Sequence, residues 1–240
     1  MLYLFLKNLI IAPFAFSVFR PWVRGRENVP ERGAVIYASN HLSFADWLFT
    51  PLALDRRITF VAKSDYFTRT GIKGWAQKRF FAGTGQVPID RSGGRASHGA
   101  LGAGLKVLQR GELFGIYPEG TRSHDGRLYK GRTGVARLAL LSGAPVVPSA
   151  IIGTDIIAPP GKIITKIVSP TVRFGTPLDF SRYEGMVEDR FILRSITDEI
   201  MYAIMELSGQ EYVDMYAPAA KAAAARDAKA REVDEVSPQT

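Results

Sequence analysis

Short apolar runs alternate with amphipathic stretches along the middle of the chain. Runs rich in β-branched and aromatic residues predict β-strands at 34–38, 58–62, 113–117, 146–152, 163–168 and 171–174. Helical spacing predicts a long helix further on, with Gly209 as its stop and an apolar stripe formed by Phe191, Ile192, Ile196, Ile200, Ile204 and Leu207. Strands that alternate with helices predict an α/β fold with a mostly parallel twisted sheet flanked by helices.

The first nineteen residues are the most apolar stretch, MLYLFLKNLIIAPFAFSVF, and arginines follow at positions 20, 24 and 26. A helix that spans a bilayer needs about 20 apolar residues, so this length is borderline, and Pro13 would kink the helix. We therefore predict a membrane-associated helical segment that dips into one leaflet, with Trp22 and the arginines at the lipid headgroups. The alternative is a helix buried in the core.

Two changes in composition divide the chain into three parts. The apolar leader occupies residues 1–25, and the polar sequence that follows opens a single domain predicted to extend over residues 26–216. The last part, 217–240, is rich in Ala, Lys, Arg and Glu and has no aromatic residue. We expect this tail to be either a solvated helix or disordered, and we assign it no chemistry.

The charge of the chain predicts anionic partners. The chain has 31 Lys and Arg against 23 Asp and Glu, a net charge of +8, which would attract phospholipid headgroups, nucleic acid or phosphorylated substrates. Basic residues outnumber acidic ones by nine to three between positions 51 and 95, where aromatic residues are interleaved. Such a stretch can bind an anionic membrane or single-stranded nucleic acid, and composition leaves both open.

The absence of cysteine narrows the possible chemistry. It excludes disulfides, thiolate metal sites and a cysteine nucleophile. His98 and His124 have no partners at the spacing of metal ligands, so we predict no metal site. Ser97, Ser142 and Ser149 do not lie in a Gly-x-Ser-x-Gly motif, which disfavours serine hydrolase chemistry.

The heptapeptide NHLSFAD, residues 40–46, follows the first predicted strand. Histidine is the natural base near neutral pH, and a carboxylate on its other ring nitrogen would fix its tautomer. Residues five apart do not face each other on a regular helix, so His41 and Asp46 can meet only if His41 lies on the turn before a helix and Asp46 reaches back from the first turn. The alternative is a surface histidine, with Ser43 or Asp46 merely capping a helix.

Two further polar clusters contain candidate binding residues. In YPEGTRS, residues 117–123, Gly120 allows close approach of the backbone to a ligand, and the planar fork of Arg122 suits phosphate. In VPIDR, residues 87–91, an apolar run ends in the charged pair Asp90 and Arg91. Ligands in α/β sheets gather at the carboxyl ends of strands, although a turn with solvated charges is the simpler alternative.

The blocks NHLSFAD, QVPIDR, YPEGTRS and APVVPSAI follow one another in the chain, and the match extends from about residue 34 to 152. Any single block is weak, but the four in this order resemble the blocks of the glycerolipid acyltransferases. The first block fits the NHxSxxD pattern of the 1-acyl-glycerol-3-phosphate acyltransferase family, and FVAK (60–63) and VRFGTPL (172–178) are also similar to it. The resemblance implies a glycerolipid acyltransferase-like fold.

The resemblance also implies roles for individual residues. His41 is similar to the general base of the family, and Asp46 to the carboxylate that orients this base. Arg91 and Arg122 resemble residues that bind the phosphate of the acceptor. The full set of positions that the resemblance assigns to substrate binding is Asn40, Ser43, Lys73, Arg91, Glu119, Gly120, Thr121 and Arg122.

The implied activity is transfer of a fatty acyl group from acyl-CoA or acyl carrier protein to the free hydroxyl of 1-acyl-glycerol-3-phosphate, which gives phosphatidic acid in phospholipid synthesis. Backbone N–H groups at the start of the helix after His41 would hold the oxyanion. The thioester is a co-substrate, and no cofactor is expected. The expected partners are a membrane phospholipid surface, the thioester donor and the lysophospholipid acceptor, without nucleic acid. The expected location is the cytoplasmic face of the cell membrane, as a peripheral or monotopic protein.

Other functions remain compatible with these residues. An acyltransferase of the same class could act on glycerol-3-phosphate, another lysophospholipid or a glycolipid. A hydrolase is also possible, because His41 and Asp46 could activate water as well as a lipid hydroxyl. A non-enzymatic binder of membrane or nucleic acid would use only the basic stretch between residues 51 and 95.

Overall fold

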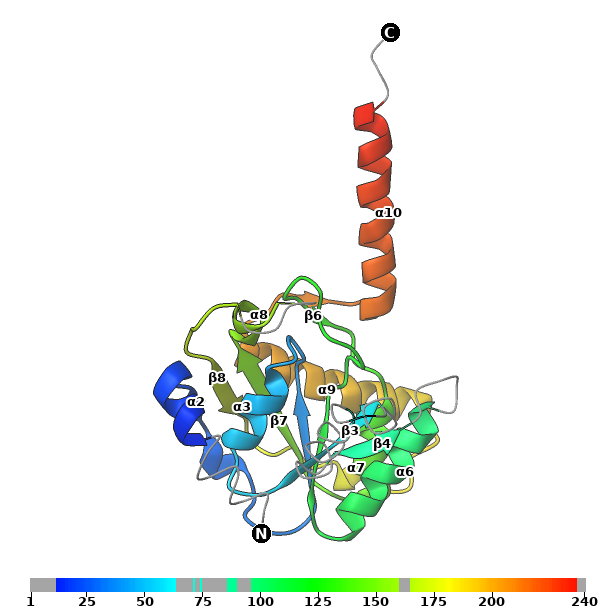
Figure 1. The fold of residues 1–240 in the computed structure, drawn as a ribbon. Helices are drawn as coiled ribbons and strands as arrows, with labels where there is room; N and C mark the ends of the chain where they lie inside the picture. The colour runs from blue at the N-terminus through cyan, green and yellow to red at the C-terminus, as the bar shows by residue number, and fades with distance from the viewer. Residues whose placement is uncertain are drawn as a thin grey trace.

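A twisted sheet forms the middle layer of the computed structural model, which describes residues 12–63, 71, 74, 86–89, 96–159 and 165–236 (Figure 1). Seven strands of the described residues make up this sheet. In spatial order they are β1 (Trp22–Arg24), β8 (Thr171–Phe174), β7 (Val146–Ile152), β2 (Val35–Ser39), β5 (Leu113–Ile116), β3 (Ile58–Lys63) and β4 (Val87–Ile89). The neighbours from β7 to β4 are parallel, and β8 pairs antiparallel with β7. The predicted mostly parallel α/β sheet is therefore confirmed.

Helices cover both faces of the sheet, which explains why β2 is apolar along its whole length. Its odd-numbered residues Val35 and Tyr37 belong to one core cluster, with α2 (Ala12–Phe19), α3 (Asp46–Leu52) and α8 (Thr154–Ile157). Its even-numbered residues Ile36 and Ala38 belong to the other, with α6 (Ala96–Gln109), α7 (Gly134–Ser142) and α9 (Arg190–Ser208). A strand buried on both faces reads as a continuous apolar run rather than an alternating one.

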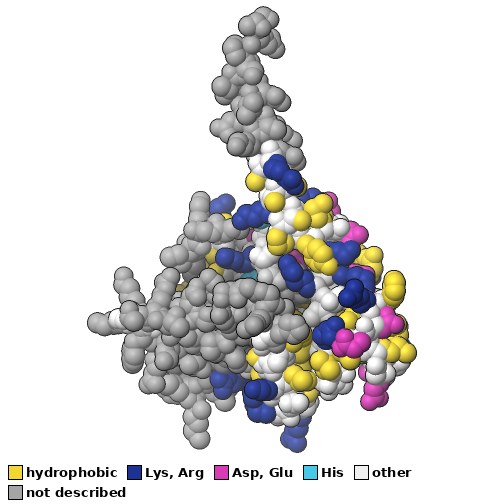
Figure 2. All heavy atoms as spheres, turned by 90° about the vertical axis from the view of Figure 1, so that its right-hand side faces the viewer, with side chains coloured by type: hydrophobic (Ala, Val, Ile, Leu, Met, Phe, Trp, Pro, Cys, Tyr) yellow, Lys and Arg dark blue, Asp and Glu magenta, His cyan; other side chains and the backbone are white. Residues whose placement is uncertain are grey.

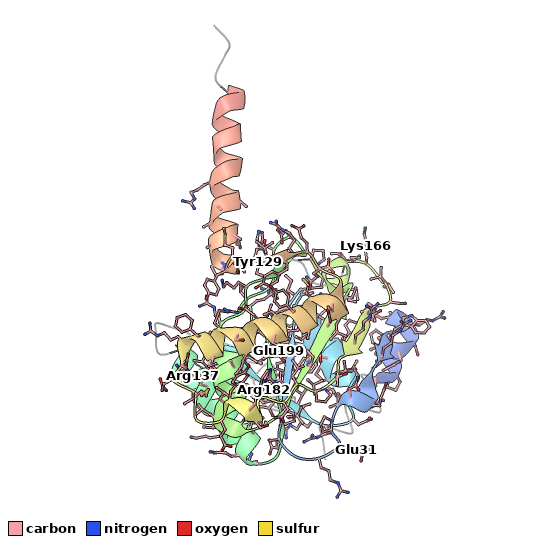
Figure 3. All side chains as sticks on the ribbon, turned by 180° about the vertical axis from the view of Figure 1, so that it is seen from behind. Glu31, Tyr129, Arg137, Lys166, Arg182 and Glu199 are labelled. Atoms are coloured by element: carbon pink, nitrogen blue, oxygen red, sulfur yellow. The ribbon has the colours of Figure 1, made fainter. Side chains whose placement is uncertain are left out.

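The long helix predicted near the end of the domain is α9, which crosses the face of the sheet that is turned toward the viewer in Figure 3. The Asp189 side chain accepts hydrogen bonds from two N–H groups of its first turn, and Gly209 ends it with a φ of 70°. Ile196, Ile200 and Ile204 are buried, as predicted. Phe191 is 88% exposed, so its place on the stripe was wrong. At 3.6 residues per turn it lies about 140° around the helix from Ile196.

The C-terminal segment leaves the sheet through a small second ladder, which pairs β6 (Leu128–Tyr129) with β9 (Tyr212–Val213). It continues as α10 (Ala217–Val236), which projects from the body of the protein (Figure 1). Ala217 and Ala220 pack with Tyr129 at the base of this helix. Of the two predicted states of the tail, a helix is therefore the one observed over residues 217–236.

One predicted strand is absent over its described part. Residues 165–168 are irregular, and three of these four side chains are exposed. The Thr165 N–H donates to the Ile157 carbonyl at 2.7 Å, so the segment joins the end of α8 instead of a sheet edge. Two short 3-10 helices, Arg26–Asn28 and Ser181–Tyr183, complete the elements of the described chain. None of its helices has the length and apolar character needed to cross a bilayer.

Candidate active site

The predicted polar clusters gather where three neighbouring parallel strands end. Asn40 and His41 follow β2, the segment that begins with Tyr117 follows β5, and Thr154 follows β7. β2 pairs with both β5 and β7, so these segments meet at one edge of the sheet. This edge is the usual place for a binding site in an α/β fold.

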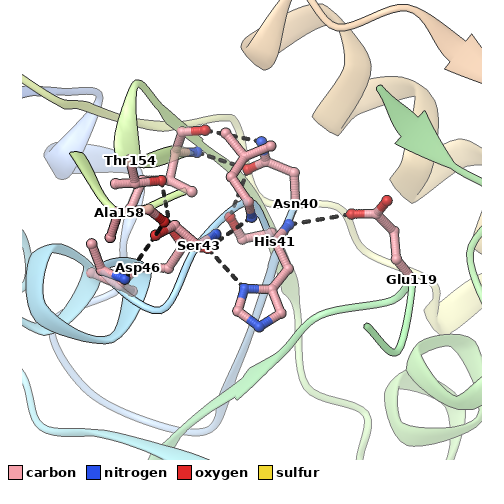
Figure 4. A network of polar contacts seen from close by, with 12 residues as sticks. Asn40, His41, Ser43, Asp46, Glu119, Thr154 and Ala158 are labelled. Carbon is pink, nitrogen blue, oxygen red and sulfur yellow. Dashed lines mark hydrogen bonds and ion pairs between the residues drawn. The ribbon is translucent and has the colours of Figure 1, made fainter. Parts of the chain in front are cut away.

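His41 and Asp46 form the contact that the sequence predicted. His41 lies on the turn after β2, and Asp46 is the first residue of α3. His41 Nδ1 lies 2.7 Å from Asp46 Oδ2. A carboxylate only accepts hydrogen bonds, so this contact selects the tautomer of the neutral imidazole in which Nδ1 carries the proton and Nε2 the lone pair. Nε2 points away from the network in Figure 4, and none of the described residues hydrogen-bonds to it. With respect to the described residues, this nitrogen is therefore open to a proton from a substrate hydroxyl.

The Asp46 carboxylate is fully buried and held on both oxygens. Besides His41, Oδ2 accepts the backbone N–H groups of Leu42 at 2.8 Å and Ser43 at 3.0 Å. Oδ1 accepts the hydroxyl of Thr154 at 2.5 Å (Figure 4). A carboxylate with this many donors has little freedom to rotate, and it fixes the imidazole in turn.

Four backbone N–H groups at the start of this helix, where oxyanion donors are expected, bind side chains of the protein. The N–H groups of Leu42 and Ser43 bind Asp46, and that of Ala45 donates to the Ser43 hydroxyl at 3.0 Å. The N–H of His41 donates to Glu119 at 3.2 Å. The turn therefore uses three of these groups to hold the carboxylates, because a short turn with two buried acids needs its own donors.

A column of three rings positions the imidazole. Tyr117 stacks on His41 with ring centroids 3.9 Å apart and planes 10° apart. Phe60 stacks on Tyr117 at 5.3 Å and 12°. Burial, and then the charge of Asp46, raise the pKa of the Tyr117 phenol well above its ordinary value, so it stays neutral. Its buried hydroxyl has no hydrogen-bond partner in the described structure.

Gly115 makes this column possible. A β-carbon at Gly115, on β5, would lie 2.2 Å from a ring atom of Phe60. The strand therefore leaves the space that Phe60 needs in order to lie beneath Tyr117.

The buried side chain of Glu119 links its own loop, residues 117–123, to the histidine turn, residues 40–46. Its side chain is 1% exposed, and its oxygens accept the N–H groups of His41 at 3.2 Å and Tyr129 at 2.9 Å. Burial raises the pKa of Glu119 from 4.5 to about 7, against the lowering effect of these two N–H groups, and the charges of Asp46 and Asp125 raise it further. Glu119 thus contacts the protein backbone on both oxygens.

Asn40 and Ser43 also have partners inside the protein, and both are buried. The Asn40 side chain forms two hydrogen bonds with the backbone of Ile151, at 2.8 and 2.9 Å, and donates to Gln210 Oε1 at 2.7 Å. The Ser43 hydroxyl donates to the Ala158 carbonyl at 2.7 Å. These contacts tie the histidine turn to β7, to α8 and to the end of α9.

The remaining predicted site residues divide into two groups. Gly120, Thr121 and Arg122 form the exposed part of the loop after β5, and no carboxylate among the described side chains pairs with Arg122. Arg91 and Lys73 lie outside the described residues.

Sequence reasoning missed Thr154 and Gln210 as members of the site, and it gave Tyr117 no role. Thr154 and Gln210 come from segments more than 100 residues away from the histidine turn. A single threonine or glutamine in a sequence carries no signal of its own. For Tyr117 the only signal in the sequence was its position, an aromatic residue between the predicted strand and Pro118.

Comparison with known proteins places this site in a family. A family model described as Acyltransferase matches residues 20–152, which is more than half of the chain. The chain therefore belongs to the acyltransferase family. Its relatives include proteins named 1-acyl-sn-glycerol-3-phosphate acyltransferase, which confirms the resemblance in the four sequence blocks.

Two relatives and one solved structure show how far the likeness extends. A chloroplastic 1-acyl-sn-glycerol-3-phosphate acyltransferase, BAT2 of Brassica napus, is 33% identical over 158 residues, which are 65% of this chain and 44% of that protein. The chain thus spans less than half of that relative's length. The Bacillus subtilis protein of the same name is 26% identical over 189 residues, 78% of this chain and 88% of that one.

The crystal structure of the 1-acyl-sn-glycerophosphate (LPA) acyltransferase PlsC from Thermotoga maritima superposes with a TM-score of 0.62. The match covers 86% of this chain and 87% of that chain at 24% sequence identity. At this identity the likeness shows a common fold.

Proposed function

We propose that this protein transfers a fatty acyl group from a thioester donor to the free hydroxyl of 1-acyl-glycerol-3-phosphate, and so produces phosphatidic acid. The observation that carries the proposal is the pair of His41 Nδ1 and Asp46 Oδ2, 2.7 Å apart, with Nε2 left without a partner in the described structure. The family and the names of the relatives support acyl transfer to this acceptor.

In the proposed mechanism His41 acts as a general base. Nε2 accepts the proton of the acceptor hydroxyl while the hydroxyl oxygen attacks the thioester carbonyl. As the tetrahedral intermediate collapses, the C–S bond breaks, and the imidazolium returns its proton to the leaving thiolate. Asp46 stabilises the imidazolium through Nδ1. The products are the ester and free coenzyme A or acyl carrier protein, and no cofactor takes part.

The predicted binding residues divide between two tasks in this proposal. Arg122, together with Arg91, would hold the acceptor phosphate, with Gly120 and Thr121 beside it and Lys73 adding positive charge. The buried Asn40, Ser43 and Glu119 would instead hold the histidine turn in place. Their side chains form hydrogen bonds with the backbone of Ile151, Ala158 and His41, respectively.

We also propose that the leader, residues 1–25, holds the 26–216 domain at the cytoplasmic face of the cell membrane, with the 217–240 tail outside this contact. The described part of the leader supports this arrangement. Ala15 and Phe19 of α2 are buried in the core, whereas Phe14 and Trp22 are each 63% exposed and Phe16 is also exposed. An apolar helix with one side packed on the core and aromatic residues exposed on the other suits an interfacial position, next to arginines that can meet lipid headgroups.

A vesicle assay tests the membrane contact. Purified protein should sediment with anionic phospholipid vesicles and bind oligonucleotides weakly at the same ionic strength, and Phe14→Ser should weaken the sedimentation. Binding to oligonucleotides alone would favour the nucleic-acid alternative and contradict this part of the proposal.

The acyl transfer is tested by the release of free thiol from palmitoyl-CoA in detergent, with and without 1-acyl-glycerol-3-phosphate. Acceptor-dependent release and phosphatidic acid in the mass spectrum are the expected result. Parallel assays with palmitoyl-acyl carrier protein identify the donor, and glycerol-3-phosphate and lysophosphatidylcholine test the acceptor. Release that does not need an acceptor would show a thioesterase and overturn the proposal, and so would a marked preference for another acceptor.

A further inference from the structure

The residues on both sides of the exposed part of the loop after β5 form hydrogen bonds with the backbone of His41. Glu119 Oε1 accepts the His41 N–H at 3.2 Å, and the Ser123 N–H donates to the His41 carbonyl at 2.8 Å. Gly120, Thr121 and Arg122 lie between these two anchors and are exposed. Any ligand bound by this loop is therefore next to the proposed base.

A second arginine lies against this loop. The Arg132 N–H donates to the Pro118 carbonyl at 2.8 Å, which brings its backbone alongside the loop. A β-carbon at Gly120 would lie 3.0 Å from Arg132 Nε and 3.2 Å from its Cδ. The Arg132 side chain therefore passes directly over the Cα of Gly120, and Gly120 has a φ of 76°, which favours glycine as well.

Arg132 differs from the basic residues around it in having no counter-charge among the described residues. Its basic neighbours form ion pairs of 2.6 to 3.0 Å, namely Arg127 with Asp125, Lys130 with Asp214, Arg137 with Glu188 and Arg194 with Asp198. The Arg132 guanidinium lies instead over the ring of Tyr216, 5.5 Å from its centroid. This cation–π contact orients the guanidinium without neutralising it.

Arg122 and Arg132 thus give the loop two cations without carboxylate partners in the described structure, while Glu119, the acid next to Gly120, is buried and bonded to the backbone. Figure 2 shows Lys and Arg side chains on the surface near the base of the projecting helix α10. Arg122 is two residues from Gly120 in the loop, and the Arg132 side chain lies against Gly120. Two arginines at one loop suit a doubly charged oxyanion, since each guanidinium can donate two hydrogen bonds.

We propose that Arg132, oriented by Tyr216, is a second arginine for the phosphate of the acceptor and acts with Arg122 across Gly120. This inference rests on the proposed function. In 1-acyl-glycerol-3-phosphate the free hydroxyl and the phosphate are on adjacent carbons, so a base that reaches the hydroxyl must have the phosphate site beside it. The loop anchored to His41 meets this requirement.

The test compares Arg132→Gln with Arg110→Gln. Arg110 is also an exposed arginine, but it pairs with Glu112 before the start of β5, at the opposite end of this strand from Glu119. Arg132→Gln should raise the KM for 1-acyl-glycerol-3-phosphate by about tenfold, the lower end of the effect of losing a charge-assisted hydrogen bond. The KM for the acyl donor should stay the same, Tyr216→Leu should raise the acceptor KM severalfold, and Tyr216→Phe and Arg110→Gln should have no effect.

Binding of inorganic phosphate, measured by calorimetry, separates this inference from the proposed function. Phosphate should bind the wild-type protein more tightly than Arg132→Gln, whatever the reaction proves to be. If the protein shows no acceptor-dependent thiol release, the proposed function fails, and weaker phosphate binding by Arg132→Gln would still support the site. An unchanged acceptor KM in an active Arg132→Gln enzyme would overturn the inference. If neither protein is active, equal phosphate binding by the wild-type protein and Arg132→Gln would overturn it.

Discussion

The hydroxyl of Thr154 lies 2.5 Å from Asp46 Oδ1, on the side of the carboxylate that faces away from His41. Both residues are fully buried, and 108 positions separate them in the chain. Thr154 begins α8 directly after β7, and Asp46 begins α3 after β2, so the pairing of these two strands brings the residues together. Thr154 thereby fixes the carboxylate that in turn fixes the imidazole.

The first prediction concerns this contact. Thr154→Val keeps the shape of the side chain but leaves Asp46 Oδ1 without its donor, which costs about 1–3 kcal/mol in a buried site. We expect kcat to fall about tenfold with little change in either KM, because the base loses orientation and the substrates keep their contacts. Thr154→Ser should restore most of the rate in the same steady-state assay. A Thr154→Val enzyme with the wild-type kcat would contradict the positioning role.

The ring column gives a second prediction. Tyr117→Leu removes the stack on His41, a contact of the kind that contributes about 0.5–1.5 kcal/mol, and kcat should fall about tenfold. Tyr117→Phe keeps the stack and removes a buried hydroxyl that has no partner in the described structure. It should therefore keep wild-type activity and unfold at the same or a higher temperature. Loss of activity in the phenylalanine variant would show that the hydroxyl itself matters.

A third prediction concerns the glycine beneath that column. A methyl group at Gly115 would overlap the Phe60 ring, and overpacking of this kind typically costs about 1–3 kcal/mol. We expect Gly115→Ala to lower the midpoint of chemical unfolding and to reduce kcat, since Phe60 can no longer support Tyr117. The double variant Gly115→Ala with Phe60→Leu should recover stability but not the full rate. Wild-type stability in the single variant would show that β5 has more room than the structure indicates.

The raised pKa of Glu119 predicts how stability depends on pH. The folded protein keeps the Glu119 proton up to about pH 7, whereas the unfolded chain releases it near 4.5. The folded state therefore binds more protons in this window, and the contribution of Glu119 to stability falls as the pH rises through it. Relative to Glu119→Gln, which does not titrate, the wild-type protein should lose on the order of 3 kcal/mol between pH 4.5 and 7.5.

Urea unfolding of both proteins across this range measures the difference directly. The Glu119→Gln variant also loses a hydrogen-bond acceptor. This loss does not depend on pH, so it shifts the free energy of unfolding of the variant by the same amount at every pH. Parallel pH dependences of the two proteins would contradict the raised pKa.

The sequence predicted the elements whose signal is local. The apolar run of β7 and the repeat of Ile196, Ile200 and Ile204 in α9 are correct, because burial on a regular element leaves a period in the sequence. The contact of His41 with Asp46 was also predictable, because both residues lie within one turn. The segment at 165–168 resembles a strand in composition, but the Thr165 N–H bonds to the end of α8 instead. Composition alone does not show whether a sheet edge is available for such a segment to pair with.

The partners from distant segments could not be predicted. Thr154, Gln210 and Arg132 reach the site only because strand order and helix packing bring their segments to one edge of the sheet. The use of backbone N–H groups follows the same rule. The turn after β2 was expected to bind an oxyanion, and this stays a prediction, but the N–H groups of His41, Leu42 and Ser43 hold the buried carboxylates of Glu119 and Asp46.

The most direct test of the account is the rate of acceptor-dependent thiol release by His41→Ala beside the wild-type protein, with far-UV circular dichroism and the unfolding temperature of both. General-base catalysis contributes roughly 10²–10⁴-fold, so kcat should fall by at least about a hundredfold. The fold should be unchanged, because the side chain of His41 is partly exposed and belongs to neither of the two large core clusters. A correctly folded His41→Ala protein that releases thiol at the wild-type rate would contradict the assignment of His41 as the base.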